Sequence, residues 1–331
     1  MSTMTSAPAP TAVPSARGLR LRGMNWLVWR QHRAAFWTLL AATAACVALI
    51  AYERAQMMSY LDAHGWPHPT SGWENGIHET RMNTICLGLG FIPVVIGVFV
   101  GGPLLANDLE NGTAKLVNSQ STSSVRWLVT KLGVNVAVVV ACTTAISVAF
   151  GWWWSPLKTL GAGLSWDSGA VFDNTGPVPV ALTLFTMVGG VAIGMLLRRA
   201  LMAMVVTFGF AVVTQLVWAY KRMSLGHIQL VTTHHGVLAD NSFPVLPNSD
   251  HVVDQFYLTA SGRLIGYGNC KEATAAATSA CLKQKHVVGW AVQYIPQSQM
   301  VGMQWLGASV LFGLTAAIAA FVIFWGRKRL V

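Results

Sequence analysis

The sequence predicts an all-α polytopic membrane protein that crosses the bilayer with six helices. Of its 331 residues, 53% are hydrophobic and 10% are charged, whereas about a quarter of the residues in a soluble globular chain carry a charge. Uncharged apolar stretches also recur along the whole chain, and each is close to the roughly 20 residues that a helix needs to cross the hydrocarbon core. A β-barrel would instead show short alternating patterns.

The six predicted spans cover residues 34–52, 84–106, 132–154, 178–197, 201–220 and 303–325. Backbone N–H and C=O groups in lipid must be hydrogen-bonded within the span, so each of these stretches is predicted to be a helix. Residues 34–331 therefore form one membrane domain, with a long loop at residues 221–302 before the last span. Residues 1–17 are rich in Pro, Ala, Ser and Thr, and we expect them to form a disordered tail.

The distribution of Lys and Arg predicts the orientation of these spans. With a cytoplasmic N-terminus, the short loops on the outer side contain only Arg54, Arg81 and Lys158. The inner segments then contain Arg17, Arg20, Arg22, Arg30, Arg33, Lys115, Arg126, Lys131, Arg198, Arg199, Arg327, Lys328 and Arg329. Basic residues accumulate in cytoplasmic loops, so both termini are predicted to be cytoplasmic and the long loop extracytoplasmic. This rule explains the net charge of +10, and no nucleic-acid partner is expected.

Residues 18–33 are predicted to form an amphipathic helix in the inner headgroup region, next to the first span. Apolar and tryptophan side chains alternate there with arginines, and such a segment binds anionic lipid with its basic face and the interface with its aromatic face. The residues that carry this prediction are Arg20, Arg22, Trp26, Trp29 and Arg30. A stop signal for the first span is the alternative, but it explains only the arginines.

Between the second and third spans, residues 104–131 form a compact amphipathic stretch with charges of both signs. In a helix, Leu104, Leu105, Leu109, Leu116 and Val117 would share an inner face. We expect Asp108, Glu110, Asn111 and Lys115 to face water, with Asn107 or Asp108 capping the start of this helix. A capped loop is the alternative, but a short helix on the inner face would offer a soluble partner a surface to bind.

The five cysteines fall into two groups. Cys46, Cys86 and Cys142 lie in predicted spans, where we interpret them as small packing residues. Cys270 and Cys281 lie in the predicted extracytoplasmic loop, where the compartment permits oxidation. We interpret them as a disulfide that stabilises the loop by about 3 kcal/mol, with free thiols as the alternative.

The motifs of several function classes are missing from the sequence. It contains no phosphate-binding G-x-x-x-x-G-K-[ST] loop and no Ser-His-Asp or H-E-x-x-H pattern, so neither nucleotide binding nor catalysis by this chain is expected. The histidines do not show zinc-ligand spacing, and no metal site is predicted. Ion-coupled carriers usually need ionisable groups at membrane depth, and the spans are nearly free of them. Any transport energy must then come from another protein.

A set of motifs around the second and third spans resembles the permease subunits of ABC-2 type ABC transporters, in particular those of actinobacteria. The resemblance covers nearly the whole chain, including the span count and the long loop before the last span. It rests on Gly-Gly-Pro-Leu-Leu at residues 101–105, Glu110-x-Gly112-Thr113, Leu116, Gln120-Ser121, Arg126-Trp127-Leu128, Lys131 and Tyr294-x-Pro296.

The resemblance implies a half-transporter in which two permease chains pair, either two copies of this chain or this chain and a similar one. Each would bind a separate ATPase subunit, which holds ATP and Mg, so this chain would bind no cofactor of its own. The segment from Asp108 to Val117 would be the coupling helix that docks in the ATPase, and residues 18–33 would also touch it. The implied coupling residues are Asp108, Glu110, Gly112, Thr113, Leu116 and Arg126.

The resemblance also places the transport path between the two permease chains, lined by the first, second and fifth spans. Candidate lining residues in the fifth span are Phe208, Phe210, Thr214, Gln215 and Trp218; for the aromatic ones, contact with lipid or simple packing is the alternative. The function expected is export of an amphipathic or hydrophobic compound, such as a drug, natural product or lipid. The alternatives are a subunit that relays force or signal without export, and an ion-coupled carrier.

Overall fold

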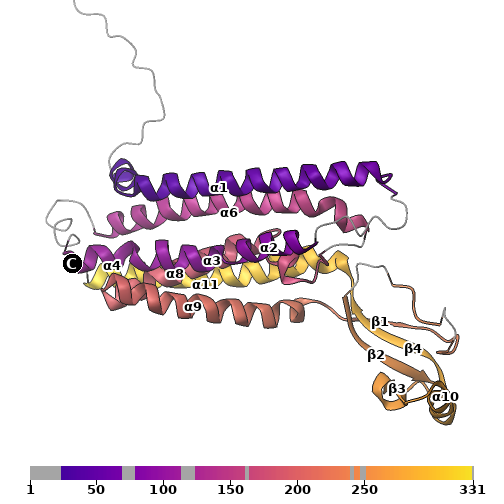
Figure 1. Ribbon diagram of the computed structural model, residues 1–331. Coiled ribbons are helices and arrows are strands. Elements are labelled where there is room, and N and C mark those ends of the chain that lie inside the picture. The colour runs from indigo at the N-terminus through magenta and orange to yellow at the C-terminus, as the bar shows by residue number, and fades with distance from the viewer. Residues whose placement is uncertain are drawn as a thin grey trace, which may run out of the picture.

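The computed structural model describes residues 24–68, 79–112, 124–160, 164–238, 242–246 and 251–329. In this part of the chain, six helical segments are long and apolar enough to cross a membrane. A small antiparallel sheet extends from one end of the helical bundle (Figure 1). We call this the sheet end, and we call the opposite end, where the first helix begins and the last one finishes, the termini end.

The long helices confirm the predicted six spans and extend several of them. The second span consists of consecutive helical pieces, whereas the other five are single helices. The first to sixth spans are α1 (Met24–Ala63); α2 (Glu79–Gly90), α3 (Ile92–Ile96), η2 (Gly97–Gly101) and α4 (Gly102–Glu110); α6 (Ser124–Leu160); α8 (Val178–Leu197); α9 (Ala200–Lys221); and α11 (Met300–Arg329).

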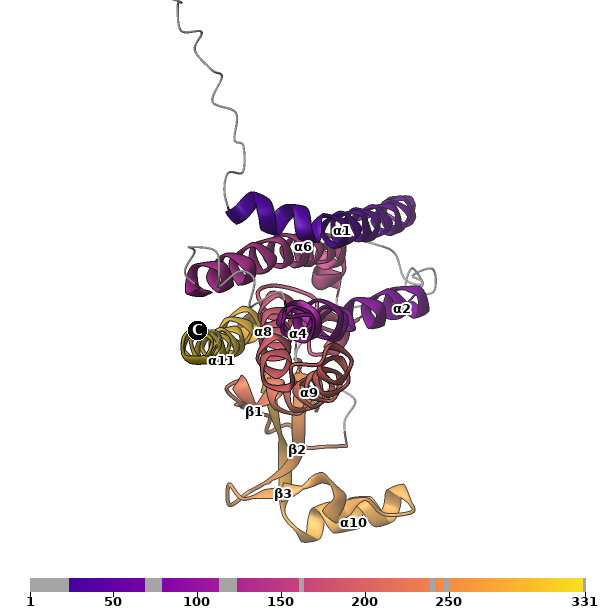
Figure 2. The same cartoon turned by 90° about the vertical axis from the view of Figure 1, so that its left-hand side faces the viewer.

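The helices form layers around α8. Figures 1 and 2 show α1 beside α6 in one layer, with α4, α8 and α11 next to it and α9 on the far side. α8 packs against α4, α6, α9 and α11 and is apolar around its whole circumference, as expected for a helix buried on all sides. The core of the bundle therefore lies around α8.

The second span is interrupted twice by proline. Pro93 and Pro103 have no backbone N–H, so each removes one helical hydrogen bond inside the span. Between them, residues Gly97–Gly101 form a π-helical turn, an irregularity that is common at functional positions. Side chains from other helices bond carbonyl groups at the first break: Gln215 donates to Gly90 O at 3.1 Å and Thr186 to Pro93 O at 2.6 Å.

Glycines bring the second span and α8 into backbone contact. A Cβ atom at Gly101 would lie 2.3 Å from Met187 O, and one at Gly194 would lie 2.3 Å from Gly102 O. Real Cβ atoms do not approach oxygen so closely, so only glycine fits at these positions. Gly97 is also in close contact with α8, since a Cβ atom there would lie 3.2 Å from Thr186 O.

The long loop contains a sheet that the sequence did not predict. Its strand order is β1-β4-β2-β3 and all pairs are antiparallel. The disulfide between Cys270 and Cys281 is formed, as predicted, and buries Cys270 against Tyr257 and Leu282. The elements are β1 (Gln229–Thr232), β2 (His251–Thr259), β3 (Leu264–Gly266), α10 (Ala275–Gln284) and β4 (Val287–Ile295). The protein is therefore all-α in its membrane part, with one added β unit.

Candidate functional site

A buried ion pair joins the second and third spans at the termini end. Lys131 on α6, whose side chain is 1% exposed, donates from Nζ to Oδ2 of Asp108 on α4. The Trp127 ring lies under the ammonium, with 5.4 Å from Nζ to the ring centroid. His32 on α1 interacts electrostatically with both charges, and its Nε2 is buried without a hydrogen-bond partner among the described residues. Three spans therefore meet at this pair.

The position of Asp108 corrects two expectations from the sequence. Asp108 was expected to face water and to cap the start of a new helix. In the structure α4 continues the second span through Glu110, so Asp108 lies in its last turn and is buried. The physical reason is Lys131: a cation expected to mark the cytoplasmic end of a span is instead turned inward, where it neutralises the carboxylate.

Glu110 connects the second span to the start of the fifth. Its Oε2 accepts a hydrogen bond from the backbone N–H of Ala200 at 2.8 Å. Ala200 begins α9 after a tight turn in which Arg198 has a positive φ of 56°. A carboxylate at a helix N-terminus accepts a hydrogen bond from a free N–H and interacts favourably with the helix dipole. Glu110 thus fixes the end of α4 against α9, a contact that sequence spacing could not show because 90 residues separate the partners.

Two further predicted coupling residues, Gly112 and Arg126, lie at the same end of the bundle. Gly112 follows α4 with a positive φ of 70°, and Arg126 is exposed in the first turns of α6. Thr113 and Leu116 lie outside the described residues, as does most of the segment predicted to form the coupling helix. Asp108, Glu110 and Arg126 are therefore all at the termini end.

The predicted interfacial helix joins the first span without a break in the described residues. α1 begins at Met24 and includes Trp26, Trp29 and Arg30, and its first turns lie at an angle to the rest (Figures 1 and 2). Trp29 packs on Phe36 with 5.0 Å between ring centroids, and Arg30 lies over the Trp26 ring at 5.1 Å. Arg20 and Arg22 lie outside the described residues.

The candidate path residues of α9 have different environments. Phe208 is exposed, whereas Phe210 packs on Phe185 with 5.3 Å between ring centroids. Thr214 donates its hydroxyl to Phe210 O at 2.9 Å. Trp218 is buried, and its Nε1 donates to Oδ1 of Asp173 at 2.7 Å. Of the five predicted residues, Gln215 lines a cavity inside the chain.

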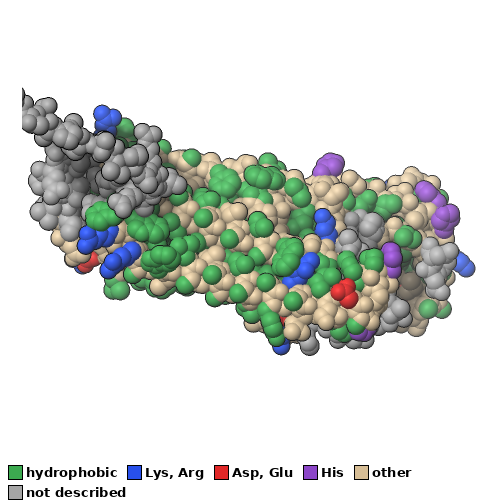
Figure 3. Space-filling model, turned by 90° about the horizontal axis from the view of Figure 1, so that it is seen from above, with side chains coloured by type: hydrophobic (Ala, Val, Ile, Leu, Met, Phe, Trp, Pro, Cys, Tyr) green, Lys and Arg blue, Asp and Glu red, His purple; other side chains and the backbone are tan. Residues whose placement is uncertain are grey.

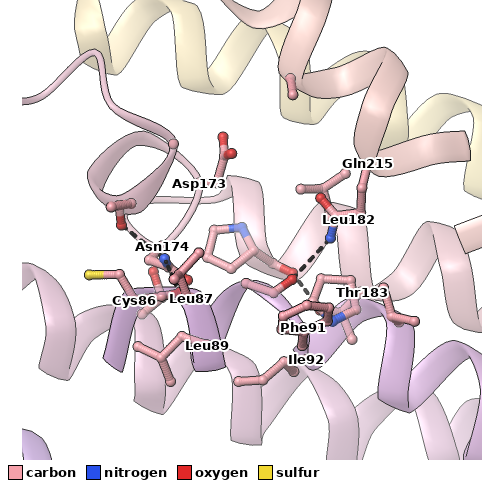
Figure 4. Close-up of a pocket in the computed structure, with 18 of the residues that line it drawn as sticks. Cys86, Leu87, Leu89, Phe91, Ile92, Asp173, Asn174, Leu182, Thr183 and Gln215 are labelled. Atoms are coloured by element: carbon pink, nitrogen blue, oxygen red, sulfur yellow. Dashed lines mark hydrogen bonds between the residues drawn. The ribbon is translucent and has the colours of Figure 1, made fainter. Parts of the chain in front are cut away.

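This cavity lies in the half of the bundle near the sheet end and has a volume of about 580 Å³ (Figure 4). Its walls come from the second span, α6, α8 and α9, and from the segment around α7 (Gly169–Phe172). The lining residues labelled in Figure 4 are Cys86, Leu87, Leu89, Phe91, Ile92, Asp173, Asn174, Leu182, Thr183 and Gln215. Sequence analysis missed this site, apart from Gln215.

Residues 164–175 form what we call the roof of the cavity, and side chains from other elements hold it. Arg222 donates to Asp173 Oδ2 at 2.8 Å, and Gln304 of α11 donates to Thr175 Oγ1 at 2.8 Å. His251 Nδ1 lies 2.5 Å from Asp167 Oδ2, which ties the sheet to the roof. Burial raises the pKa of the Asp173 carboxyl, and the Arg222 charge opposes that rise. The roof therefore joins α9, α11 and the sheet.

In the described part of the chain, no group of three or more His, Cys, Asp or Glu side chains is placed to hold a metal ion. Figure 3 shows many hydrophobic side chains along one face of the bundle, basic side chains near the termini end and also toward the sheet end, and histidines toward the sheet end. This distribution is that of a membrane protein with polar ends.

Comparison with known proteins identifies the family. A family model described as "ABC-2 membrane transporter related" matches residues 40–222, more than half of the chain. Neither the curated proteins nor the solved structures yield a match. The matched segment contains the Asp108–Lys131 pair, Glu110 and all the residues that line the cavity. The chain therefore belongs to the ABC-2 membrane transporter related family and is a multi-pass membrane protein of the ABC-2 permease type.

Proposed function

We propose that this chain is the membrane-spanning subunit of an ATP-driven exporter, in which a separate ATPase subunit binds at the termini end. The observation that carries the proposal is the junction formed by Asp108, Lys131 and Glu110 in a chain of the ABC-2 family. In this proposal the termini end faces the cytoplasm, in agreement with its content of Lys and Arg.

The junction has the connections that force transmission requires. The second span leaves the bundle at Glu110, and its last turn is bonded to α6 through Lys131 and to α9 through Ala200. A displacement of the segment that follows Glu110 would therefore act on the second, third and fifth spans together. An ATPase that binds this segment and changes shape on ATP binding would move three spans at once.

The proposed cargo is an amphipathic or hydrophobic compound, moved between two permease chains. The second chain is a further copy of this one or a similar permease. Support for an apolar cargo comes from the surface of α9, where large hydrophobic side chains such as Leu201, Val205 and Phe208 are exposed. Charged cargo would need paired or solvated charges in the path, and the surface of α9 offers none between residues 200 and 220.

The test is co-purification of the tagged chain from its native membrane in mild detergent, followed by an ATPase assay. Glu110→Lys should abolish co-purification or stimulation of the ATPase, because a cation at the α9 N-terminus is repelled by the helix dipole. Glu110→Gln keeps an acceptor for Ala200 N–H and should retain most of the activity. Glu272→Lys, the same charge reversal at an exposed position next to α10, is the matched control.

The proposal fails if no nucleotide-hydrolysing protein accompanies the native chain, or if Glu110→Lys stimulates ATP hydrolysis as well as Glu272→Lys does. Insertion of each variant is checked by its yield in the membrane fraction, so that loss of folding is not mistaken for loss of coupling.

The sheet favours a second candidate function, the relay of force or signal without export. The sheet is a folded, disulfide-bonded unit, and it is bonded to the roof through His251. Reconstituted vesicles separate the two functions: ATP-dependent movement of a fluorescent lipid or hydrophobic dye supports export. A complex that hydrolyses ATP but moves neither compound supports the relay.

A further inference from the structure

We propose that the cavity near the sheet end is a binding site for an uncharged, largely apolar molecule that carries a hydroxyl or N–H group and enters from the lipid. The site lies within a single chain and is distinct from a path between two permease chains. The inference goes beyond the proposed transport function, because binding is measured on this chain without an ATPase.

The size and composition of the cavity are those of a ligand site. Its volume of about 580 Å³ falls within the roughly 300–1,000 Å³ of pockets that hold small molecules. Most of its wall is apolar, with side chains such as Leu182, Ile92 and Ile146, and a few polar groups lie among them. Polar side chains at membrane depth are costly, so their grouping around one cavity requires an explanation.

The charges around the cavity disfavour an ionic ligand. Asp173 is the single charged residue of the lining, and its carboxylate accepts hydrogen bonds from Trp218 and from the Arg222 guanidinium, which neutralises its charge. A cation would compete with Arg222 for this carboxylate, and an anion would meet a carboxylate and no available donor of charge-assisted hydrogen bonds. A neutral ligand avoids both costs.

The polar lining groups offer acceptors more than donors. The hydroxyl of Ser147 donates to Gly176 O at 2.9 Å and that of Thr143 to Val139 O at 2.8 Å. The Asn174 amide donates to Cys86 O at 3.2 Å and to Ala170 O at 2.8 Å. The donors of these three side chains are thus used on backbone carbonyls, whereas their amide and hydroxyl oxygens keep lone pairs. A ligand with its own O–H or N–H complements this pattern.

The amide of Asn83 provides the most accessible polar contact. It lines the cavity, is exposed, and has no hydrogen-bond partner among the described residues. Gln215 also lines the cavity and uses its amide N–H on Gly90 O, which leaves its carbonyl oxygen as an acceptor. The two amides come from the second and fifth spans, so the cavity offers polar contacts from both.

The lateral rim of the cavity is apolar. Leu87, Phe91 and Leu216 line the cavity and are each more than half exposed on the side of the bundle. Side chains of this kind in a membrane-spanning segment face lipid. A molecule dissolved in the bilayer would therefore reach the cavity between the second span and α9 without passing through water.

Gly90 allows a direct test, because a Cβ atom added there meets no atom within 4 Å although Gly90 lines the cavity. Gly90→Phe should therefore fill the cavity without displacing the protein. Gly88 lies in the same helix, is exposed, does not line the cavity, and also has open space around an added Cβ. Gly88→Phe is thus the matched control.

The probe is a neutral monoacylglycerol with a diazirine in its acyl chain, added to the purified chain in lipid nanodiscs and activated by light. Labelling of peptides that contain residues 83–94 or 164–175 is expected in the native chain and in Gly88→Phe. It should fall about tenfold in Gly90→Phe, because the space is then filled. The alkyl sulfonate with the same diazirine chain, which stays ionised at neutral pH in a bilayer, should label these peptides far less.

Equal labelling of the Gly88→Phe and Gly90→Phe chains overturns the proposal, as does equal labelling by the neutral and the anionic probe. Labelling spread evenly over the exposed face of α9 shows contact with bulk lipid only and also overturns it. Asn83→Leu is a second variant, which does not depend on the folding of Gly90→Phe. The exposed Asn83 side chain makes no hydrogen bond to the described residues, so its replacement should leave the fold intact. Loss of its hydrogen bond to the ligand should lower labelling about fivefold.

Discussion

Lys131 shows how a single side chain can hold two spans together at the termini end of this protein. The ammonium is removed from water by α6 and Trp127, which costs free energy unless a counter-ion is present. Asp108 supplies the counter-ion from the last turn of the second span. The pair therefore fixes which turn of α4 lies against which turn of α6.

Lys131→Met is expected to lower the free energy of unfolding by roughly 3–5 kcal/mol, because it leaves the Asp108 carboxylate buried without its cation. The double variant Lys131→Met, Asp108→Leu removes both charges and should recover most of this loss. The measurement is unfolding by a denaturing detergent in mixed micelles. A double variant no more stable than Lys131→Met would show that the ion pair does not determine stability here.

At the residue scale, sequence analysis located the polar segment at the end of the second span but not the partners of its residues. The spacing around Asp108 and Glu110 marked a polar segment at the end of a span, and both residues lie there. Their partners Lys131 and Ala200 could not be predicted, because hydrogen bonds across 23 and 90 residues depend on how the helices pack. The same holds for Gln215, whose cavity is formed by four spans.

At the element scale, α8 organises the bundle through glycine. Gly190 and Gly194 face the second span, where Gly97 and Gly102 present bare backbone. Helices in lipid gain little from hydrophobic association and depend on close packing of small residues. The contact between α8 and the second span is therefore expected to be among the most sensitive in the protein.

Gly194→Val should disrupt this contact, since its Cβ would lie 2.3 Å from Gly102 O. Overpacking of this kind costs about 1–3 kcal/mol or more. Gly209→Val in α9 is the control, because an added Cβ there meets no atom within 4 Å. Thermal denaturation of the two purified variants should show a lower midpoint for Gly194→Val alone; equal midpoints would contradict the role assigned to the glycine contact.

The spans could be predicted because a bilayer imposes a minimum apolar length, and α8 matches its predicted bounds of 178–197. The sheet could not be predicted, because no comparable minimum length marks a short strand in a loop. β2 and β4 each have nine residues, but their pairing depends on contacts between distant parts of a loop. Strand preference also depends on the neighbouring strands. The disulfide was predictable because both cysteines lie in one short segment of that loop.

At the scale of the whole molecule, the two ends have different chemistry. The termini end carries the Asp108–Lys131 pair, Glu110 and exposed basic residues, and the sheet end carries the disulfide and the roof of the cavity. A disulfide is stable outside the reducing cytosol. Both features support the same orientation, with the sheet on the outside.

Single cysteines test this orientation in intact cells. Val245 near the sheet is 99% exposed, so Val245→Cys should react with a membrane-impermeant maleimide added outside. Lys328 is exposed at the end of α11, and Lys328→Cys should react only after the membrane is permeabilised. The native chain, whose Cys46, Cys86 and Cys142 all lie within spans, sets the background. Labelling of Lys328→Cys in intact cells would reverse the assignment.

The interrupted second span has a mechanical consequence. Bending a regular helix breaks hydrogen bonds, but at Pro93 and Pro103 those bonds are already missing, and the π-helical turn between them adds a further irregularity. The half that lines the cavity and the half that ends at Asp108 and Glu110 are therefore joined, near Gly97–Gly101, by a segment that resists bending less than a regular helix does. The glycines of α8 contact the second span at this level, so a bend there would act directly on α8.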